Sequence, residues 1–463
     1  MIRRLPLVAT VILLAGCVGD RPAPPPAPLA AEFAGNRDGG LSERELSGWW
    51  FAIPDPDLHA AVDLALRNAV DLRTALARLD AAAARYGVAR GALLPAVGMT
   101  VAGERSDPSD RTGNTDAGAR TEGSGGIEAS WEIDLWGAVR AAKDAGLAEA
   151  EAAGFDAADV SRLLVAEVAR TAGGAAIFDH RARLAAAMAG IQARRLAVSA
   201  SRAAAGIGLP EEPDQDGAAL AARLTAADDL TTAATRARLR QRELSGLPAT
   251  AAIPVLKGLP MVPATAPVGV PADLLRRRPD IRRAERRLAA AAARVGVQEA
   301  DLYPRLTLTG TVGMAVRRGV GGSAGDAVFW GFGPSIRWRL FEGGAVRAGI
   351  LAAQADARAE AAAWERLVLA AQREVADGLA ALDQARREAD QRSAEVARLT
   401  AAEALAARRV AAGIGDPRSV LDAALARLAA EDRHAQAVTK ELDAFVALAA
   451  ACGGGWDIAA APQ

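Results

Sequence analysis

Aromatic residues make up only 4% of the 463 residues, and the chain has two cysteines, three histidines and three lysines. Transition-metal sites draw on histidine and cysteine at characteristic spacings, whereas His59, His180 and His434 are scattered through the sequence. The formal net charge of −1 gives no basic footprint for nucleic acid. No G-x-x-x-x-G-K-S/T loop is present, so no phosphate-cradling motif is found. These absences predict no metal site, no bound cofactor and no nucleic-acid partner.

The N-terminus holds the longest apolar run, and beyond it no run of about 20 apolar residues predicts a membrane-spanning helix. MIRRLPLVATVILLAGC has a positive start and an apolar stretch from Leu5 to Leu14, which predicts a secretory signal peptide over residues 1–16. Its end resembles a bacterial lipobox, which implies cleavage before Cys17 and acylation of that cysteine. The alternative is an ordinary signal peptide with an incidental cysteine. By resemblance to lipoproteins, Val18 is compatible with sorting to the outer membrane.

An internal repeat is the most informative feature of what the chain does contain. DLRTALARLDAAAARYGVARGALLP from Asp71 aligns without a gap with DIRRAERRLAAAAARVGVQEADLYP from Asp280. LWGAVRAA from Leu135 matches LFEGGAVRAG from Leu340 after a two-residue insertion, and AAGIGLP matches AAGIGDP further along. The first alignment pairs Arg85 with Arg294, Gly87 with Gly296, and Pro95 with Pro304. The chain is therefore predicted to be a duplicated domain.

Differences in composition along the chain indicate where the two repeats begin and end. Each repeat is predicted to consist of a helix, two strands joined by a loop, a very long helix, a break and a final helix. Proline and glycine mark the extended segments between them. The predicted parts are a signal peptide (1–16), a lipid-anchored, proline-rich tether (17–54), repeat 1 (55–246), an inter-repeat linker (247–270), repeat 2 (271–452) and a C-terminal tail (453–463).

Strict alternation of apolar and polar residues marks the predicted strands. From Ile127 to Leu135 every second residue is apolar, and a period of two predicts a strand with one apolar face. The strands are predicted at about 95–106, 124–136, 304–316 and 328–341. Such alternation is typical of outer-membrane β-barrels, whose apolar residues face lipid, although a half-buried sheet in a soluble domain alternates as well.

The number of strands has a consequence for assembly. Four strands cannot close a barrel, because the smallest closed barrels have about eight. An open edge cannot remain in lipid, so other copies of the chain would have to seal it. Three copies predict a barrel of about twelve strands. The connections that begin near Ser106 and Arg317 are rich in Gly, Asp and Ser, and they are predicted to be outward-facing loops.

Two spans without proline, from Gly137 to Gly206 and from Gly344 to Ala412, predict exceptionally long helices. Each has about 70 residues and would be roughly 100 Å long, a length typical of coiled coils. Shorter helices are predicted at about Asp55–Leu94 and Asp280–Leu302. The breaks that end the long helices predict the turns of a helical tip, at Gly206, Gly208, Gly413, Gly415 and Asp416. A helical tube of this length beside a short barrel suits a protein that crosses the periplasm.

Four segments carry a family resemblance that covers nearly the whole mature chain. They are LLRRRPDIRRAERRLAAAAARVGVQEADLYPRLTLTG from Leu274, ASWEIDLWG from Ala129, WRLFEGGAVRA from Trp338, and GGGW from Gly453. In these segments the chain resembles the TolC-like outer membrane factors, in the lipoprotein branch of RND-type efflux components. The resemblance implies a mainly α-helical protein with a membrane β-barrel, assembled as a homotrimer in the outer membrane of a Gram-negative bacterium.

The resemblance also implies a function and partners. The chain would be a passive duct of a tripartite system, exporting drugs or other small molecules, with no enzymatic chemistry of its own. Its partners would be a periplasmic adaptor, an inner-membrane RND-type pump and the lipid of the outer membrane. In the family, aspartates near the start of the last helix line a constriction at the periplasmic tip. Asp422 falls on the inner aspartate, whereas Ser419 occupies the position of a second one.

Two other functions remain open at this point. A duct for type I protein secretion would share the same architecture, although the lipobox favours efflux. A periplasmic adaptor or a purely structural coiled-coil lipoprotein belongs to a different class. An adaptor would carry a split lipoyl-like β-domain, and a coiled-coil lipoprotein would lack alternating strands of ten residues. Substrate identity is not encoded here, because the pump selects the substrate.

The lipobox generates a first prediction. Cys17→Ala should abolish incorporation of a radioactive fatty acid, which we expect to label only the wild-type protein. Export should persist in the variant, because one lipid chain is a modest anchor beside an inserted barrel. Equal labelling of wild type and variant would show that Cys17 does not carry the lipid.

Overall fold

The structure is a computed structural model, and it describes residues 43–106, 120–207, 209–265, 277–319 and 324–457. The predicted signal peptide, Cys17, Gly208 and part of the predicted linker lie outside these residues. The described residues form two compact units. The strand unit contains residues 79–106, 120–153, 284–319 and 324–364, and the coiled-coil unit contains the other described residues.

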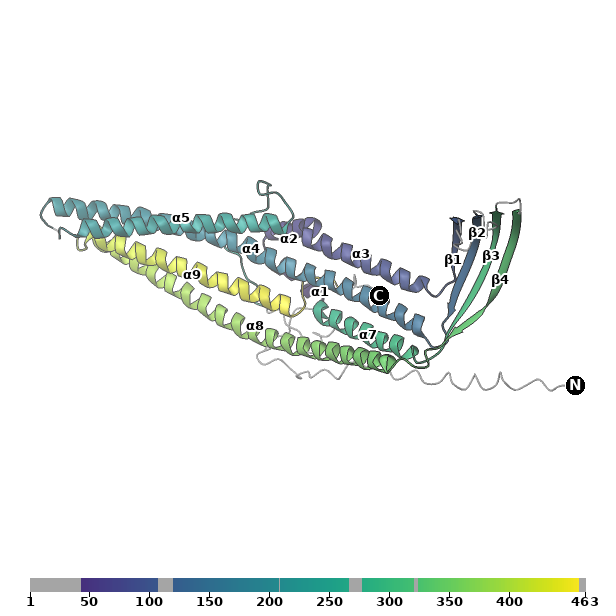
Figure 1. Cartoon of the computed structure of the whole chain (residues 1–463). Helices are drawn as coiled ribbons and strands as arrows, with labels where there is room; N and C mark the ends of the chain where they lie inside the picture. The colour runs from purple at the N-terminus through teal and green to yellow at the C-terminus, as the bar shows by residue number, and fades with distance from the viewer. Residues whose placement is uncertain (1–42, 107–119, 208, 266–276, 320–323, 458–463) are drawn as a thin grey trace. The chain divides into compact units, whose positions relative to one another are not determined.

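Four antiparallel strands form the sheet of the strand unit (Figure 1). In order across the sheet they are β1 (Ala96–Ser106), β2 (Arg120–Ile133), β3 (Arg305–Gly319) and β4 (Ala324–Arg337). Repeat 1 supplies β1 and β2, and repeat 2 supplies β3 and β4, so the central pairing joins the two repeats. Within the described part of the chain, β1 and β4 are edges with no further strand beside them.

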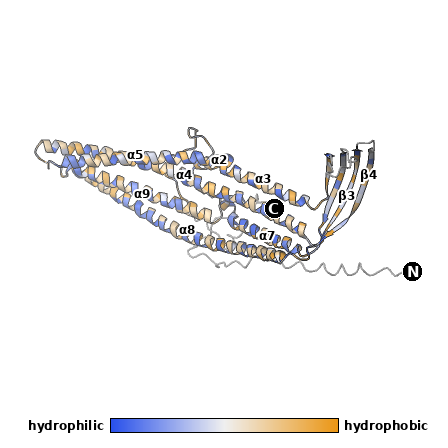
Figure 2. Ribbon diagram, in the orientation of Figure 1, coloured by the Kyte–Doolittle hydropathy of each residue, from blue (hydrophilic) through white to orange (hydrophobic). Residues whose placement is uncertain are grey.

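The register gives the sheet two different faces. One row of paired residues consists of Met99, Ile127, Val312 and Trp330, and the next row consists of Gly98, Glu128, Thr311 and Gly331. Because successive side chains point to opposite faces, one face is apolar and the other is polar. Figure 2 shows hydrophilic and hydrophobic residues mixed along the strands. The apolar face is open in the single chain, with Met99 76% and Phe332 81% exposed.

Two strands start and end earlier than the side-chain pattern predicts. β2 begins at Arg120 rather than about 124, and β4 begins at Ala324 rather than about 328. Arg318 was predicted to lie in the loop before β4, but it belongs to β3 and pairs with Ala324 of β4. Strand pairing uses backbone hydrogen bonds, so it can continue where the side chains no longer alternate. β2 ends at Ile133 rather than about 136, since the Asp134 carboxylate accepts hydrogen bonds from the first backbone amides of the next helix. β4 likewise ends at Arg337 rather than about 341.

Tryptophans connect the strand ends to the ends of the shorter helices, α3 (Val70–Gly91) and α7 (Pro279–Ala300). The Trp131 indole donates a hydrogen bond to the carbonyl oxygen of Leu93 (3.0 Å), and that of Trp338 donates to Leu302 (3.1 Å). Leu93 and Leu302 occupy equivalent positions in the two repeats. Carbonyls just past a helix end lack helical partners, so the indoles satisfy acceptors that the fold leaves free at both helix-to-strand junctions.

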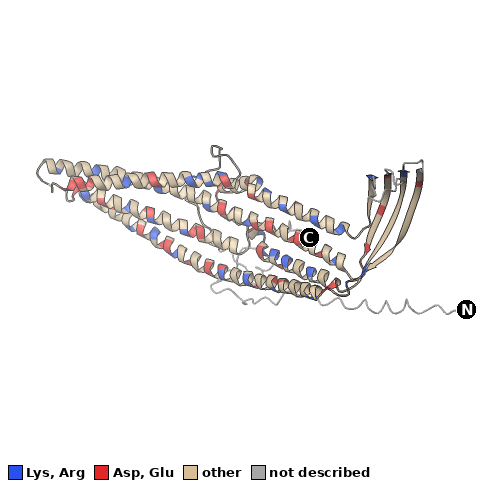
Figure 3. Cartoon of the chain, viewed as in Figure 1, with Lys and Arg blue, Asp and Glu red and all other residues tan. Residues whose placement is uncertain are grey.

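The long helices are α4 (Ala138–Ala204) and α8 (Ala345–Ala411), each 67 residues without interruption. Both begin after a glycine with positive φ, Gly137 (81°) or Gly344 (92°). In the coiled-coil unit, α5 (Glu212–Leu244) returns after α4, and α9 (Pro417–Ala451) returns after α8. Acidic and basic residues are distributed along all four helices (Figure 3). The long proline-free spans are therefore helices, as their composition predicts.

The prediction of one helix over about Asp55–Leu94 is wrong. The structure has α2 (Pro56–Asn68) and α3, separated by Ala69, whose ψ of 130° is extended. The Asn68 carbonyl beside this break packs against Gly246, where an added Cβ would lie 2.4 Å from the carbonyl oxygen. The break therefore lets the start of repeat 1 lie against the end of α5.

The core of the coiled-coil unit contains a few large side chains, of which Trp49 and Phe445 are fully buried. Trp49 lies in a short 3-10 helix, η2 (Trp49–Ala52), that follows α1 (Glu43–Ser47). Elsewhere alanines dominate the buried positions, which allows helices to approach closely. Among the described residues, no helix combines the length and the apolar character needed to cross a membrane.

Candidate functional site

The polar face of the sheet carries acids on β2 and bases on β3. Glu122 and Arg317 are direct cross-strand partners and form an ion pair of 2.7 Å between Oε1 and Nε. Glu128 and Glu132 follow on the same face of β2, opposite Thr311 and Thr307 of β3. Such a surface is suited to water, whereas the opposite face is suited to hydrocarbon.

Phe329 is an exception on the polar face. Its row contains Thr100, Gly126 and Gly313. A Cβ added to Gly313 would lie 2.6 Å from the Phe329 Cζ atom, and one added to Gly126 would lie 3.7 Å from it. The ring therefore lies across the two glycines of the neighbouring strands, which is possible only because neither has a side chain.

The predicted tip turns lie in the coiled-coil unit. Gly206 and Gly413, which end the long helices, have positive φ values of 68° and 76°. Gly415 lacks a positive φ, and a Cβ added to it would make a tight contact of 3.1 Å with the Val410 Cγ2 atom. Asp416 is the N-cap of α9, because its side chain accepts a hydrogen bond from the Arg418 amide (2.8 Å).

Asp422, the predicted constriction residue, forms an ion pair with Arg195 of α4, at 2.6 Å between Oδ1 and Nη1. The same guanidinium contacts Asp216 of α5, at 2.9 Å between Nε and Oδ1. Asp216 is buried, and Gln192 also donates a hydrogen bond to its carboxylate. The Asp422 side chain is 52% exposed. One arginine of repeat 1 therefore holds aspartates from both repeats.

Among the described residues, this contact is one of four between arginines of α4 and aspartates of α9 or of its N-cap. Together they form what we call the α4–α9 ladder. Its members are Arg170–Asp443 (3.2 Å), Arg181–Asp432 (2.7 Å), Arg195–Asp422 (2.6 Å) and Arg202–Asp416 (3.9 Å). A second set joins α9 to α8 and includes Lys440–Glu388 and Arg433–Glu395. The α4–α9 ladder connects repeat 1 to repeat 2, whereas the second set lies within repeat 2.

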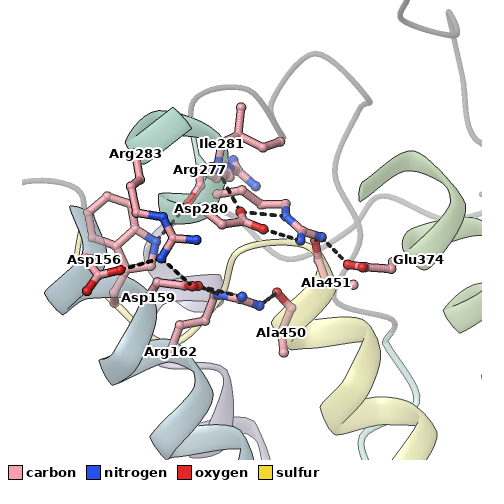
Figure 4. A network of polar contacts seen from close by, with 12 residues as sticks. Asp156, Asp159, Arg162, Arg277, Asp280, Ile281, Arg283, Glu374, Ala450 and Ala451 are labelled. Atoms are coloured by element: carbon pink, nitrogen blue, oxygen red, sulfur yellow. Dashed lines mark hydrogen bonds and ion pairs between the residues drawn. The ribbon is translucent and has the colours of Figure 1, made fainter. Parts of the chain in front are cut away.

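A buried network of arginines and aspartates closes the C-terminal end of α9 (Figure 4). Arg278 forms an ion pair with Asp280 (2.6 Å) and another with Glu374 of α8 (2.7 Å). Its Nη1 atom also donates to the Ala451 carbonyl oxygen (3.1 Å). From α4, Arg162 donates to the carbonyl oxygen of Ala450 (2.7 Å). Two buried guanidinium groups therefore satisfy the last carbonyls of α9, where the helix dipole favours positive charge.

Both members of the central ion pair are held in their charged forms. Burial alone would raise the pKa of Asp280, but the hydrogen bonds and charge of Arg278 lower it overall. Burial opposes the charge of Arg278 as well, yet Asp280 and Glu374 raise its pKa. The pair is thus stable only as a unit, because removing one partner leaves an uncompensated charge inside the protein.

The GGGW segment after α9 brings the N-terminal part of the coiled-coil unit to the same place. A Cβ on Gly454 would lie 2.7 Å from the Leu46 carbonyl oxygen and 2.9 Å from the ring of Trp49. Gly453 and Gly455 have positive φ values of 80° and 101°. The indole of Trp456 donates to the carbonyl oxygen of Arg277 (2.8 Å). The three glycines therefore let the GGGW segment cross closely over the segment that holds Leu46 and Trp49.

The family model for outer membrane efflux proteins matches residues 61–247 and 270–454. The chain belongs to the outer membrane efflux protein family. It is 32% identical to outer membrane protein OprJ of Pseudomonas aeruginosa, over 95% of this chain and 92% of OprJ. It is 29% identical to nodulation protein T of Rhizobium leguminosarum, over 82% and 78%.

Solved structures agree with the fold of this efflux protein. The outer-membrane channel OprN superposes with a TM-score of 0.82 at 32% identity, covering 93% of this chain and 98% of OprN. The open state of the MtrE outer membrane channel of Neisseria gonorrhoeae gives 0.81 at 25% identity, covering 94% and 97%. The resemblance to TolC-like outer membrane factors, inferred from sequence, is confirmed, and the chain is an outer-membrane efflux protein.

Several contacts of this efflux protein escape sequence reasoning because their partners are far apart in the chain. Arg195 and Arg162 lie in alanine-rich helix without any motif, and only the fold brings them to Asp422 and to the end of α9. His180 and His434, scattered in sequence, interact electrostatically across α4 and α9. Burial and Arg183 lower the pKa of His180, and His434 adds to this shift. No cluster of three or more potential metal ligands occurs among the residues that the structure describes.

The buried network generates a prediction about stability. Arg278→Leu should lower the free energy of unfolding by about 3–5 kcal/mol, because Asp280 would remain buried without its partner. Since the folded-state pKa of Asp280 lies below its ordinary value, its contribution is present above that ordinary value and is lost as the pH falls through the folded pKa. Thermal unfolding in detergent, followed by circular dichroism across acidic pH, measures both effects.

Arg373→Leu provides the matched control for this measurement. Arg373 forms an exposed ion pair with Asp377 on α8, and exposed pairs contribute only about 0–1 kcal/mol. Equal destabilisation by the two substitutions would contradict the importance of the buried network.

Proposed function

We propose that this efflux protein is one protomer of a homotrimeric duct, lipid-anchored through Cys17 in the outer membrane. The duct works with a periplasmic adaptor and an inner-membrane RND-type pump, and it conducts small molecules passively. The single observation that carries the proposal is the sheet, which has one exposed apolar face, one polar face and two edges that no other described strand pairs with. We also propose that the mature chain consists of the tether, the two repeats, the linker and the tail given above.

Closure of the sheet supports the homotrimer. Unpaired backbone groups cannot remain in hydrocarbon, and four strands are too few to close on themselves. β1 and β4 run antiparallel to each other by their order in the sheet, so β4 of one copy can pair with β1 of the next. Three copies give about twelve strands, within the range of outer-membrane barrels. The polar face then lines the passage.

Relatives favour small molecules over proteins as cargo. TtgF of Pseudomonas putida, 29% identical, is a toluene efflux pump outer membrane protein, and OpmQ, 31% identical in that species, is a pyoverdine export outer membrane protein. A type I protein secretion duct is the second candidate, and no feature of the described residues favours it. The pump provides the energy and selects the cargo, so the duct itself needs only a wetted passage.

Deletion of this protein from its own bacterium tests the function. We expect deletion to raise the intracellular accumulation of small fluorescent pump substrates several-fold and to leave the secretome unchanged, with restoration by the intact gene. Loss of a secreted protein with unchanged dye accumulation would favour the secretion duct instead.

For the gate, we propose that the tip rests closed, with Asp422 of each copy near the lumen and the α4–α9 ladder holding the two hairpins together. Opening would separate repeat 2 helices from α4, so the contacts that must break are Arg195–Asp422 and Arg202–Asp416. These pairs are partly exposed and individually weak, which suits a gate that an adaptor can open by docking. A ring of carboxylates also favours cations over anions.

Planar-bilayer recordings test this gate. Arg195→Ala and Asp422→Ala should both raise the resting conductance, because each removes the same link between α4 and α9. Only Asp422→Ala should also reduce the cation selectivity. Arg433→Ala is the matched control, because it breaks a contact within repeat 2 and should leave the resting conductance unchanged. Unaltered selectivity in a correctly assembled Asp422→Ala channel would place Asp422 on a solvated outer face.

A further inference from the structure

The apolar face of the sheet becomes charged at the end that carries the two hairpin connections. Within the four described strands, the charged residues on this face are Arg105, Arg318 and Asp326, and all three lie in its last two rows. The opposite end of the sheet is joined to the helices α3, α4, α7 and α8. Charge on the apolar face is therefore confined to the end that is remote from the helices.

Two arginines flank a threonine in the last row of this face. Arg105 of β1 pairs with Thr121 of β2, which pairs in turn with Arg318 of β3. Neighbouring strands are about 4.8 Å apart, so the backbones of the two arginines lie about 10 Å apart with Thr121 between them. All three residues are exposed. Two guanidinium groups beside a hydroxyl group suit one anion with several oxygens, such as a phosphate.

Carboxylates of the described residues do not neutralise this row. Asp326 of β4 pairs with Val316, one row away from Arg318, but it forms no ion pair with that arginine. Glu122 belongs to the opposite face, where it forms an ion pair with Arg317. Of two consecutive arginines on β3, one thus has a carboxylate partner in the chain, whereas the other has none among the described residues. Arg318 is available to a partner outside the chain.

The length of the apolar face gives the depth of this row in a membrane. Along β3 the apolar face runs from Leu306 to Val316, which are ten residues apart, before it reaches Arg318. At a rise of about 3.4 Å per residue and a tilt of about 35–45°, this stretch spans roughly 24–28 Å of membrane. The apolar band of an outer-membrane barrel is about 25 Å tall. In the proposed barrel, Arg105 and Arg318 would therefore lie where hydrocarbon gives way to lipid headgroups.

We propose that Arg105, Thr121 and Arg318 bind the phosphate group of a glycolipid in the outer leaflet of the outer membrane. The two guanidinium groups would donate hydrogen bonds to the phosphate oxygens, and the Thr121 hydroxyl would donate another. The acyl chains would lie along the apolar rows below, where Val101 is 72% and Met314 is 55% exposed. This inference rests on the proposed function, because it requires the apolar face to lie in a membrane.

A phosphorylated lipid is the occupant that fits both parts of this surface. The basic row and the exposed apolar rows are continuous on one face of the sheet. Basic residues at a membrane surface attract anionic lipid headgroups, and the apolar rows can cover acyl chains. Free phosphate would contact only the basic row and would gain nothing from the apolar rows. The site therefore favours a lipid over a free anion.

Native mass spectrometry of the full-length protein in detergent tests the site, with diphosphoryl lipid A as the probe. We expect a wild-type trimer to bind one molecule per copy. Arg318→Gln should weaken this binding on the order of tenfold, because it removes charge-assisted hydrogen bonds. Arg317→Gln is the matched control, since it removes the neighbouring positive charge from the opposite face and should bind the probe as wild type does.

Two further probes identify the source of the phosphate. Dephosphorylated lipid A should bind more weakly than the diphosphoryl form, and an equal concentration of inorganic phosphate should not displace the diphosphoryl form. Displacement by inorganic phosphate would show a site for free phosphate and would overturn the lipid assignment.

The two variants also separate this inference from the proposed function. Equal binding of diphosphoryl lipid A by Arg318→Gln and Arg317→Gln, in variants that remain trimeric, would show that the assignment of the site is wrong while the duct stands. If even the wild-type protein is not trimeric, the proposed function fails together with this inference.

Discussion

A strand edge that faces hydrocarbon leaves amide and carbonyl groups without partners, and each such group costs several kcal/mol. The sheet has two such edges, β1 and β4, together with an exposed apolar face. A single chain therefore cannot place this sheet in a membrane. In the proposed assembly, other copies would satisfy the edges and would turn the polar face, with Glu122 and Arg317, toward a common interior.

Duplication gives the chain two copies of the same order of elements, a shorter helix, two strands, a 67-residue helix and a returning helix. The repeats are not identical, however. Gly246 and Gly453 occupy equivalent positions and pack against equivalent carbonyls, those of Asn68 and Arg277. Only repeat 2 has a buried arginine at the next position, Arg278, since the equivalent residue in repeat 1 is Ala69. Buried ion pairs thus hold the C-terminal end of α9, whereas more exposed and weaker ion pairs hold its N-terminal end near the tip turns.

Sequence reasoning succeeds here wherever a property repeats along the chain. Alternation predicts four strands, proline-free alanine-rich spans predict the two long helices, and the internal alignment predicts the duplication. It fails where backbone pairing ignores side-chain pattern, as at Ala324, and where Ala69 breaks a helix without any proline or glycine. It also cannot predict Arg195–Asp422, because neither helix carries a local signal that identifies its partner. The family resemblance thus identifies Asp422 as a candidate gate residue, but nothing in the sequence identifies Arg195 as the residue that pairs with it.

We propose that this chain becomes a channel only when several copies share one barrel. Mass measurement of the purified protein in detergent tests this sharing, provided that circular dichroism shows an intact β signal. We expect a trimer as the single species. A monodisperse monomer that retains its β structure would contradict the shared barrel.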